Sequence, residues 1–280
     1  MYMRLKDGKS KVFTMSYDDG VVQDIRLSEI MRKNGLKGTF NINSGLYYDE
    51  DKDRAVFDGR MKLSEAKELY IGSGNEIAVH GYTHPYLEKL RNEDIIDEIV
   101  KDRLSVEHNY GVIAKGMAYP FGTFNDTVIA ALKLCGISYA RTVNSTGKFD
   151  FPSDWLKLNP TCHHNSPDLM KLADIFVENE PKYHNVWMFY LWGHSYEFDQ
   201  NDNWNVIEKF AEFIGQRKDV WYATNIEIYN YVRAYQSLQT SVDKSIIYNP
   251  SDIDVWISLQ ADVIKIHAGE TVYLKNNYCI

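Results

Sequence analysis

The chain alternates short apolar runs with amphipathic segments over most of its length. Runs such as 12–15 and 76–79 have the length and composition of buried strands. Segments such as 21–34 and 92–108 repeat apolar residues every three or four positions, which is typical of one helix face. Strands that alternate with helices predict βαβ units and a parallel sheet. About seven such units follow one another before residue 240, so we predict a distorted (β/α) barrel of about seven strands.

The pattern also gives the extent of the elements. The predicted strands are 12–15, 37–42, 76–79, 112–119, 137–143, 156–158, 186–192 and 220–223, and the predicted helices are 21–34, 62–71, 92–108, 125–134, 167–178, 204–215 and 226–235. After residue 241 only short β-type runs separated by turns remain, at 246–248, 255–259, 263–266 and 271–274. We therefore predict a barrel over residues 1–240 and a small antiparallel β extension over 241–280 that packs on it.

Composition and charge narrow the classes of partner. The formal net charge is −8 and no long basic run occurs, which argues against nucleic acid. Cys135, Cys162 and Cys279 are far apart and form no CxxC motif, so neither a disulfide framework nor a thiolate metal site is indicated. No segment has membrane-spanning length, and the first residues lack the apolar core of a signal peptide. We expect a cytoplasmic protein without a membrane partner, unless a leader has been removed; the oligomeric state stays open.

Polar residues stand at the C-terminal ends of several predicted strands. Asp18 and Asp19 follow the first apolar run, His80 follows the strand at 76–79, and His194 follows the strand at 186–192. In a parallel barrel these ends lie on one rim, where active sites assemble from separate strands. Asp is disfavoured in strands and neighbouring carboxylates repel, so the Asp18–Asp19 pair indicates a nearby positive charge.

A second pair of polar residues suggests that this charge is a metal ion. His80 and His84 are four residues apart, and Pro85 favours a turn over a continuing helix. Imidazole and carboxylate together suit Zn²⁺, Fe²⁺, Co²⁺ or Ni²⁺, whereas Mg²⁺ and Ca²⁺ prefer more oxygen ligands. The two His with the acidic pair therefore predict a transition-metal site.

The order of four motifs resembles a known family. Ser-Tyr-Asp-Asp-Gly (16–20), His-Gly-Tyr-Thr-His (80–84), Tyr-Pro-Phe-Gly (119–122) and Leu-Trp-Gly-His (191–194) resemble the polysaccharide deacetylases of carbohydrate esterase family 4, which have the NodB-homology fold. The resemblance covers roughly residues 10–235, and its first two motifs are the specific ones. It implies a metal-dependent hydrolase that removes N- or O-acetyl groups from a carbohydrate.

The resemblance also implies roles for individual residues. Asp18 would be the general base, His194 the general acid and the backbone N–H of Phe121 the oxyanion donor. One divalent transition metal, with Zn²⁺ as the first choice and Co²⁺, Ni²⁺ or Fe²⁺ as the others, would be held by Asp19, His80 and His84. Around the acetylated carbohydrate we expect Tyr119, Pro120, Trp155 and Leu191, the last two beside the acetyl methyl group.

The sequence departs from the family pattern at Ala118. There the family has an Arg that orients the catalytic Asp, and we consider Arg141, from the neighbouring strand, as its replacement; otherwise Arg141 is an ordinary surface residue. His163 and His164 have no counterpart in the family, and His163 is included as a group near the substrate.

Two other functions are compatible with these residues. Asp19, His80 and His84 could form the 2-His-1-carboxylate triad of an Fe(II) enzyme, although Asp18 and His194 would then have no role. The missing Arg could instead mark a carbohydrate-binding relic of the same fold that has lost catalysis.

Overall fold

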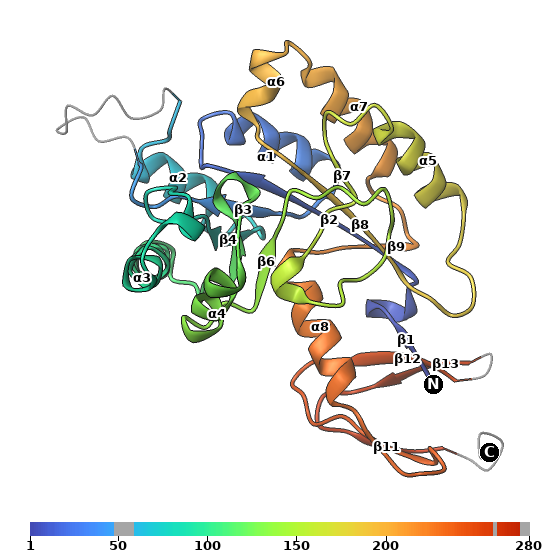
Figure 1. Ribbon diagram of the computed structural model, residues 1–280. Helices are drawn as coiled ribbons and strands as arrows, with labels where there is room; N and C mark the ends of the chain where they lie inside the picture. Colours follow the sequence, from blue (N-terminus) through green and yellow to red (C-terminus); the bar gives the residue numbers. More distant parts are fainter. Residues whose placement is uncertain (48–58, 260–261, 275–280) are drawn as a thin grey trace.

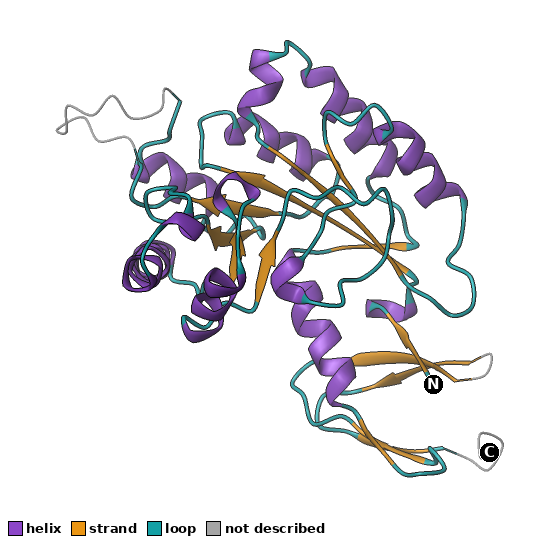
Figure 2. Cartoon of the chain, viewed as in Figure 1, coloured by secondary structure: helices purple, strands orange, loops and turns teal. Residues whose placement is uncertain are grey.

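A curled parallel sheet with helices on its outer side forms the body of the protein. The computed structural model describes residues 1–47, 59–259 and 262–274 (Figure 1; Figure 2). The strand order is β6-β5-β4-β3-β2-β8-β7, with β9 paired to β2, and these pairs are parallel. This confirms the predicted distorted barrel. Its strands are β2 (Lys11–Asp18), β3 (Thr39–Ile42), β4 (Glu76–Val79), β5 (Gly116–Ala118), β6 (Tyr139–Arg141), β7 (Cys162–His163), β8 (Trp187–Gly193) and β9 (Val220–Tyr222).

Strand β2 is the centre of this sheet. All eight of its residues are buried, as expected of a strand covered on both faces. One edge pairs with β8 from Lys11 to Tyr17, and the other edge pairs first with β9 and then with β3. Asp18 is therefore the end of the longest fully buried strand in the described part of the chain.

The segment from Leu158 to His163 links the two ends of the sheet. Leu158 N–H donates to the Ala140 carbonyl in β6, and the Leu158 carbonyl accepts the N–H of Thr142. Thr161 N–H then donates to the carbonyl of Tyr190 in β8. The predicted strand at 156–158 is wrong, because Trp155–Lys157 is a 3₁₀ turn. The Asp154 side chain accepts the N–H of Leu156, which satisfies that backbone group locally and removes the need for a strand partner.

Helices surround the sheet close to their predicted positions. Asn125 caps α4 by accepting the N–H of Val128, Thr224 and Glu227 form a capping box at the start of α8, and Gly111 ends α3 in the left-handed conformation. The five-residue α6 was not predicted, since it is too short to show a helical repeat. The helices are α1 (Asp24–Lys33), α2 (Leu63–Tyr70), α3 (Asn92–Tyr110), α4 (Asp126–Leu134), α5 (Leu169–Glu178), α6 (Tyr196–Gln200), α7 (Trp204–Ile214) and α8 (Asn225–Ser237).

Two small antiparallel sheets lie beyond α8, at the bottom of Figure 1. One contains β10 (Gln239–Thr240), β11 (Ile246–Tyr248) and β14 (Thr271–Tyr273), and the other contains β12 (Val255–Leu259) and β13 (Asp262–Ile266). The antiparallel extension is thus present. Its second sheet also includes β1 (Tyr2–Arg4), which pairs with β12 and was not predicted. Among the described helices, none is both long and apolar enough to cross a membrane.

Candidate active site

The C-terminal ends of the barrel strands surround one cavity of about 450 Å³. Asp18 ends β2 and Arg141 ends β6, while His80 and His194 directly follow β4 and β8. The parallel arrangement brings these chain positions together, as expected for a barrel rim. The cavity is lined by Asp18, Asp19, Arg60, His80, His84, Tyr119, Phe121, Gly122, Val143, Trp192, His194 and Tyr196.

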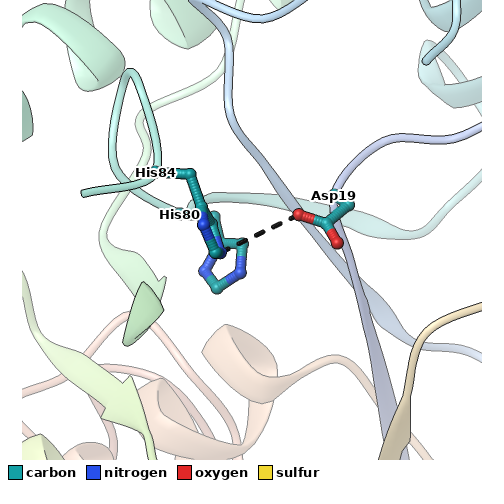
Figure 3. Close-up of side chains that lie close together, drawn as sticks. All are labelled: Asp19, His80 and His84. Carbon is teal, nitrogen blue, oxygen red and sulfur yellow. Dashed lines mark ion pairs between the residues drawn. The ribbon is translucent and has the colours of Figure 1, made fainter. Parts of the chain in front are cut away.

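Asp19, His80 and His84 form a three-donor cluster on this rim (Figure 3). One ligand atom from each lies within 4.8 Å of the others, and His84 Nε2 is 4.0 Å from Asp19 Oδ1. His80 Nδ1 lies 2.8 Å from the Ala118 carbonyl, which can only accept, so Nδ1 carries the proton and Nε2 keeps a free lone pair. Burial lowers the pKa of His84 to about 4, with a further contribution from His80, so its imidazole is neutral at pH 7. These donors fit a divalent transition metal.

The backbone at this cluster adopts conformations that non-glycine residues seldom use. Asp19, His84 and Phe121 have φ angles of 85°, 56° and 57°, in the left-handed region. Such strain persists only where the surroundings fix it. Asp19 N–H donates to the Asn41 carbonyl at 2.9 Å, and the Phe121 ring stacks on Tyr86 with centroids 3.9 Å apart. The His84 ring packs against Phe121 in a T-shaped arrangement with centroids 4.4 Å apart, so this stack also orients a predicted metal ligand.

Two buried residues that support the cluster were not predicted from the sequence. Arg60 Nη2 lies 3.1 Å from Asp19 Oδ1, and Nη1 donates to the Asp19 carbonyl. On α3, Asp102 accepts the backbone N–H groups of His80 and Ser44 at 2.9 Å, and burial outweighs these bonds and raises its pKa to about 7. Asp102 could have been found, because it is an acid on the apolar face of a helix; Arg60 gives no such signal.

Asp18 is a buried carboxylate with partners for both oxygens. Oδ1 accepts from Asn41 Nδ2 at 2.8 Å, and Oδ2 pairs with the guanidinium of Arg141. His80 Nε2 and His194 Nε2 lie 3.7 and 3.8 Å from Oδ2. Burial by itself would raise the pKa of Asp18, but Arg141 and then the two His outweigh it and hold the pKa well below its usual range. Asp18 is therefore ionised at neutral pH.

The structure shows whether Arg141 can replace the Arg that is missing at Ala118. The two residues are register partners on β5 and β6, and Arg141 is 1% exposed rather than on the surface. Its guanidinium also lies 4.4 Å from the centre of the Trp192 ring. The neighbouring strand thus supplies the positive charge that Ala118 lacks.

We expect Arg141→Ala to move the acidic limb of the pH–rate profile to higher pH by about one to two units. The guanidinium favours the ionised form of Asp18, so its loss raises the pKa of Asp18, and a general base works only above its pKa. The measurement is kcat/KM across pH, with unfolding followed in parallel, since an unpaired buried Asp18 destabilises the fold. Arg26→Ala is the control, because Arg26 forms an exposed pair with Glu208. A limb that stays in place in a folded Arg141→Ala protein contradicts the assignment.

Comparisons with known proteins point to one family. A sequence model of the family described as "Polysaccharide deacetylase" matches residues 5–140. This confirms the resemblance to the polysaccharide deacetylases. No curated protein sequence matches the chain.

Three solved structures are similar to this chain, and the first of them shows the same fold. A Mycobacterium smegmatis protein that bears this family's name has 15% identity and a TM-score of 0.56, over 84% of this chain and 94% of its own. A family 4 carbohydrate esterase from Streptomyces lividans, in complex with acetate, has 16% identity and a TM-score of 0.47, over 76% of this chain and 91% of its own. A Streptococcus pyogenes deacetylase, also with acetate, has 22% identity and a TM-score of 0.46; the match covers 51% of this chain and 61% of the streptococcal one.

Not every residue expected around the substrate lies at this cavity. Tyr119 lines it, with its hydroxyl donating to the Leu156 carbonyl at 2.8 Å. Leu191 points into the core instead, and its neighbour Trp192 lines the cavity, because successive strand residues face opposite sides. Trp155 packs on Tyr229, with centroids 5.2 Å apart, in a separate apolar cluster.

Pro120 and His163 are also outside the lining. Pro120 is buried against Gly81, and His163 faces Glu197 rather than the cavity. Trp155 and Leu191, expected beside the acetyl methyl group, therefore do not line this cavity, and neither do Pro120 and His163. Contact of these four residues with a substrate stays a prediction.

Proposed function

We propose that this chain is a metal-dependent deacetylase that hydrolyses N- or O-acetyl groups of a carbohydrate. The proposal rests on one observation, which is that two adjacent carboxylates have different neighbours. Asp19 lies with His80 and His84, while Asp18 lies between Arg141 and His194 in the same cavity. One carboxylate can thus serve as a ligand while the other handles a proton.

Asp19, His80 and His84 would hold one divalent transition metal, with Zn²⁺ as the first choice. Its chemistry there would be that of a Lewis acid, which polarises the acetyl carbonyl and makes water more acidic. Asp18 accepts the proton of the attacking water, because its charged neighbours outweigh the effect of burial and keep it ionised, and its side chain lines the cavity.

Phe121 and His194 act on the other side of the scissile bond. Within the described residues, the backbone N–H of Phe121 donates to no protein acceptor, and its left-handed φ turns the peptide at the cavity wall. It is suited to donate to the carbonyl oxygen as negative charge develops there. His194 presents Nε2 beside Asp18 and can hand its proton to the departing amine or alkoxide.

The two rival functions draw less support from the site. The carbohydrate-binding relic rested on the lost Arg at Ala118, and Arg141 supplies that charge. An Fe(II) enzyme would use the triad alone and leave the paired, ionised Asp18 without a role. Hydrolysis gives a role to both Asp18 and His194 as well as to the three candidate ligands.

The proposal is tested by acetate release from a panel of N-acetylated and O-acetylated oligosaccharides, combined with metal analysis of the protein. We expect one metal per chain and acetate release that a chelator abolishes. A fully metal-loaded protein that releases no acetate but retains an oligosaccharide would favour the relic. The loops 44–61 and 144–166, which we expect to choose the sugar, overlap residues 48–58 that lie outside the described part of the chain.

A further inference from the structure

A second cluster of imidazoles meets the carboxylate of Glu197 next to His194. His194 Nδ1 is hydrogen-bonded to Glu197 Oε1 at 3.3 Å. The other oxygen, Oε2, lies 3.1 Å from His163 Nε2 and 2.9 Å from His164 Nε2. His164 is fully buried, and Glu197 is 20% exposed. Three His therefore share one carboxylate at the edge of the cavity.

His163, His164 and Glu197 are close enough together to be considered as metal ligands. The protonation of His163 argues against this. Its Nδ1 accepts the backbone N–H of Asn165 at 3.1 Å, so in the neutral ring the proton is on Nε2, the atom that faces Glu197. A protonated Nε2 cannot coordinate a cation. His80 shows the opposite arrangement, with Nδ1 donating and Nε2 free.

We propose that Glu197 is the positioning residue of His194, and that His163 and His164 hold Glu197 in place. By accepting the Nδ1–H of His194, Glu197 fixes both the tautomer and the ring orientation, so that Nε2 is the atom directed toward Asp18. The catalytic consequence of this arrangement rests on the proposed function; the arrangement itself does not. His163 and His164, which matched nothing in the family motifs, thereby gain a role.

The charges around His194 agree with this role. Asp18 faces it from β2 and Glu197 from α6, while the rings of Tyr196 and His163 lie 5.2 and 6.4 Å from its ring. Burial lowers the pKa of His194, but the Glu197 hydrogen bond and the nearby carboxylates outweigh it, so the pKa is raised. Burial also raises the pKa of Glu197, but the three His hold it well below its usual range. Glu197 is therefore ionised when His194 carries its proton.

The first test is histidine ¹⁵N NMR on the parent protein, which requires neither a variant nor activity. We expect neutral His194 to carry its proton on Nδ1. A proton on Nε2 in the neutral ring would overturn the proposal, whatever the protein's activity.

The second test is Glu197→Gln, with Asp199→Asn as the matched control on the same helix. Asp199 accepts from Trp204 Nε1 and Gln23 Nε2 and contacts no imidazole of the cluster. We expect Glu197→Gln to lower the pKa of His194 and to reduce kcat by at least about tenfold at unchanged KM. The loss should not exceed the roughly 10²–10⁴-fold that a general acid supplies. Glu197→Asp keeps the charge and should restore part of the loss. Parental kcat and an unchanged His194 titration in Glu197→Gln would overturn the proposal.

Metal analysis distinguishes the positioning role of Glu197 from a second metal site. Together with acetate release, it also tests the positioning role independently of deacetylation. A second metal equivalent that disappears in His163→Ala would show a metal site and overturn the positioning role. An Nδ1–H tautomer that depends on Glu197, in a protein that releases no acetate, would support the positioning role and refute deacetylation.

Discussion

Asp18→Asn is expected to retain the metal and to lose about 10²–10⁴-fold in kcat/KM. The amide has the shape of the carboxylate but cannot accept the proton of the attacking water. Metal content should stay at the parental level, because Asp19, His80 and His84 are unchanged. The measurement is acetate release under saturating metal, together with the bound metal per chain.

The control for this variant must address stability as well as chemistry. Asp18→Asn leaves the buried guanidinium of Arg141 without its counter-charge, which can cost about 3–5 kcal/mol of folding free energy. The double variant Asp18→Asn/Arg141→Met removes both charges and should regain stability without regaining activity. Near-parental turnover in a folded Asp18→Asn protein would place the general base on another residue.

His84→Ala is expected to weaken metal binding by more than about 100-fold, since even the loss of a residue that only orients a ligand costs 10–100-fold. His84 is the better ligand to remove, because its side chain is 20% exposed, whereas His80 is buried and its loss would leave a cavity. Metal affinity is measured by competition with a chelator.

His108→Ala, on the exposed side of α3, is the control for losing a His elsewhere. If His80→Ala and His84→Ala both hold metal as tightly as the parent, the ion is bound by other residues.

The sequence predicted the barrel because its local signals agreed with the tertiary environment. The strand at 76–79 and the start of the helix at 92 coincide with β4 and α3 in the structure, since apolar repeats and strong turn residues bound them. The turn after His80 was also predicted correctly from Pro85. The strand predicted at 156–158 was wrong because the Asp154 side chain satisfies the backbone locally.

The candidate site divides in the same way. Motifs near strand ends placed Asp18, Asp19, His80, His84 and His194 on the rim, because a parallel barrel gathers all C-terminal strand ends at one side. The sequence could not show whether Leu191 or Trp192 faces the cavity. Strand β8 is apolar on both faces, so its composition shows no alternation that would reveal which residue faces the cavity.

From the sequence we predicted most of the barrel strands and helices, the rim and three candidate metal ligands, since these depend on local periodicity and on short motifs. The tertiary structure alone decided that Arg141 meets Asp18, that Arg60 and Asp102 support the ligands, and that Glu197 meets three His. These partners are 3 to 123 positions apart in the chain and come together through strand register and helix packing. The attraction between two charges depends on their distance in space. The number of residues between them in the sequence does not predict that distance, so these pairs could not be identified from the sequence.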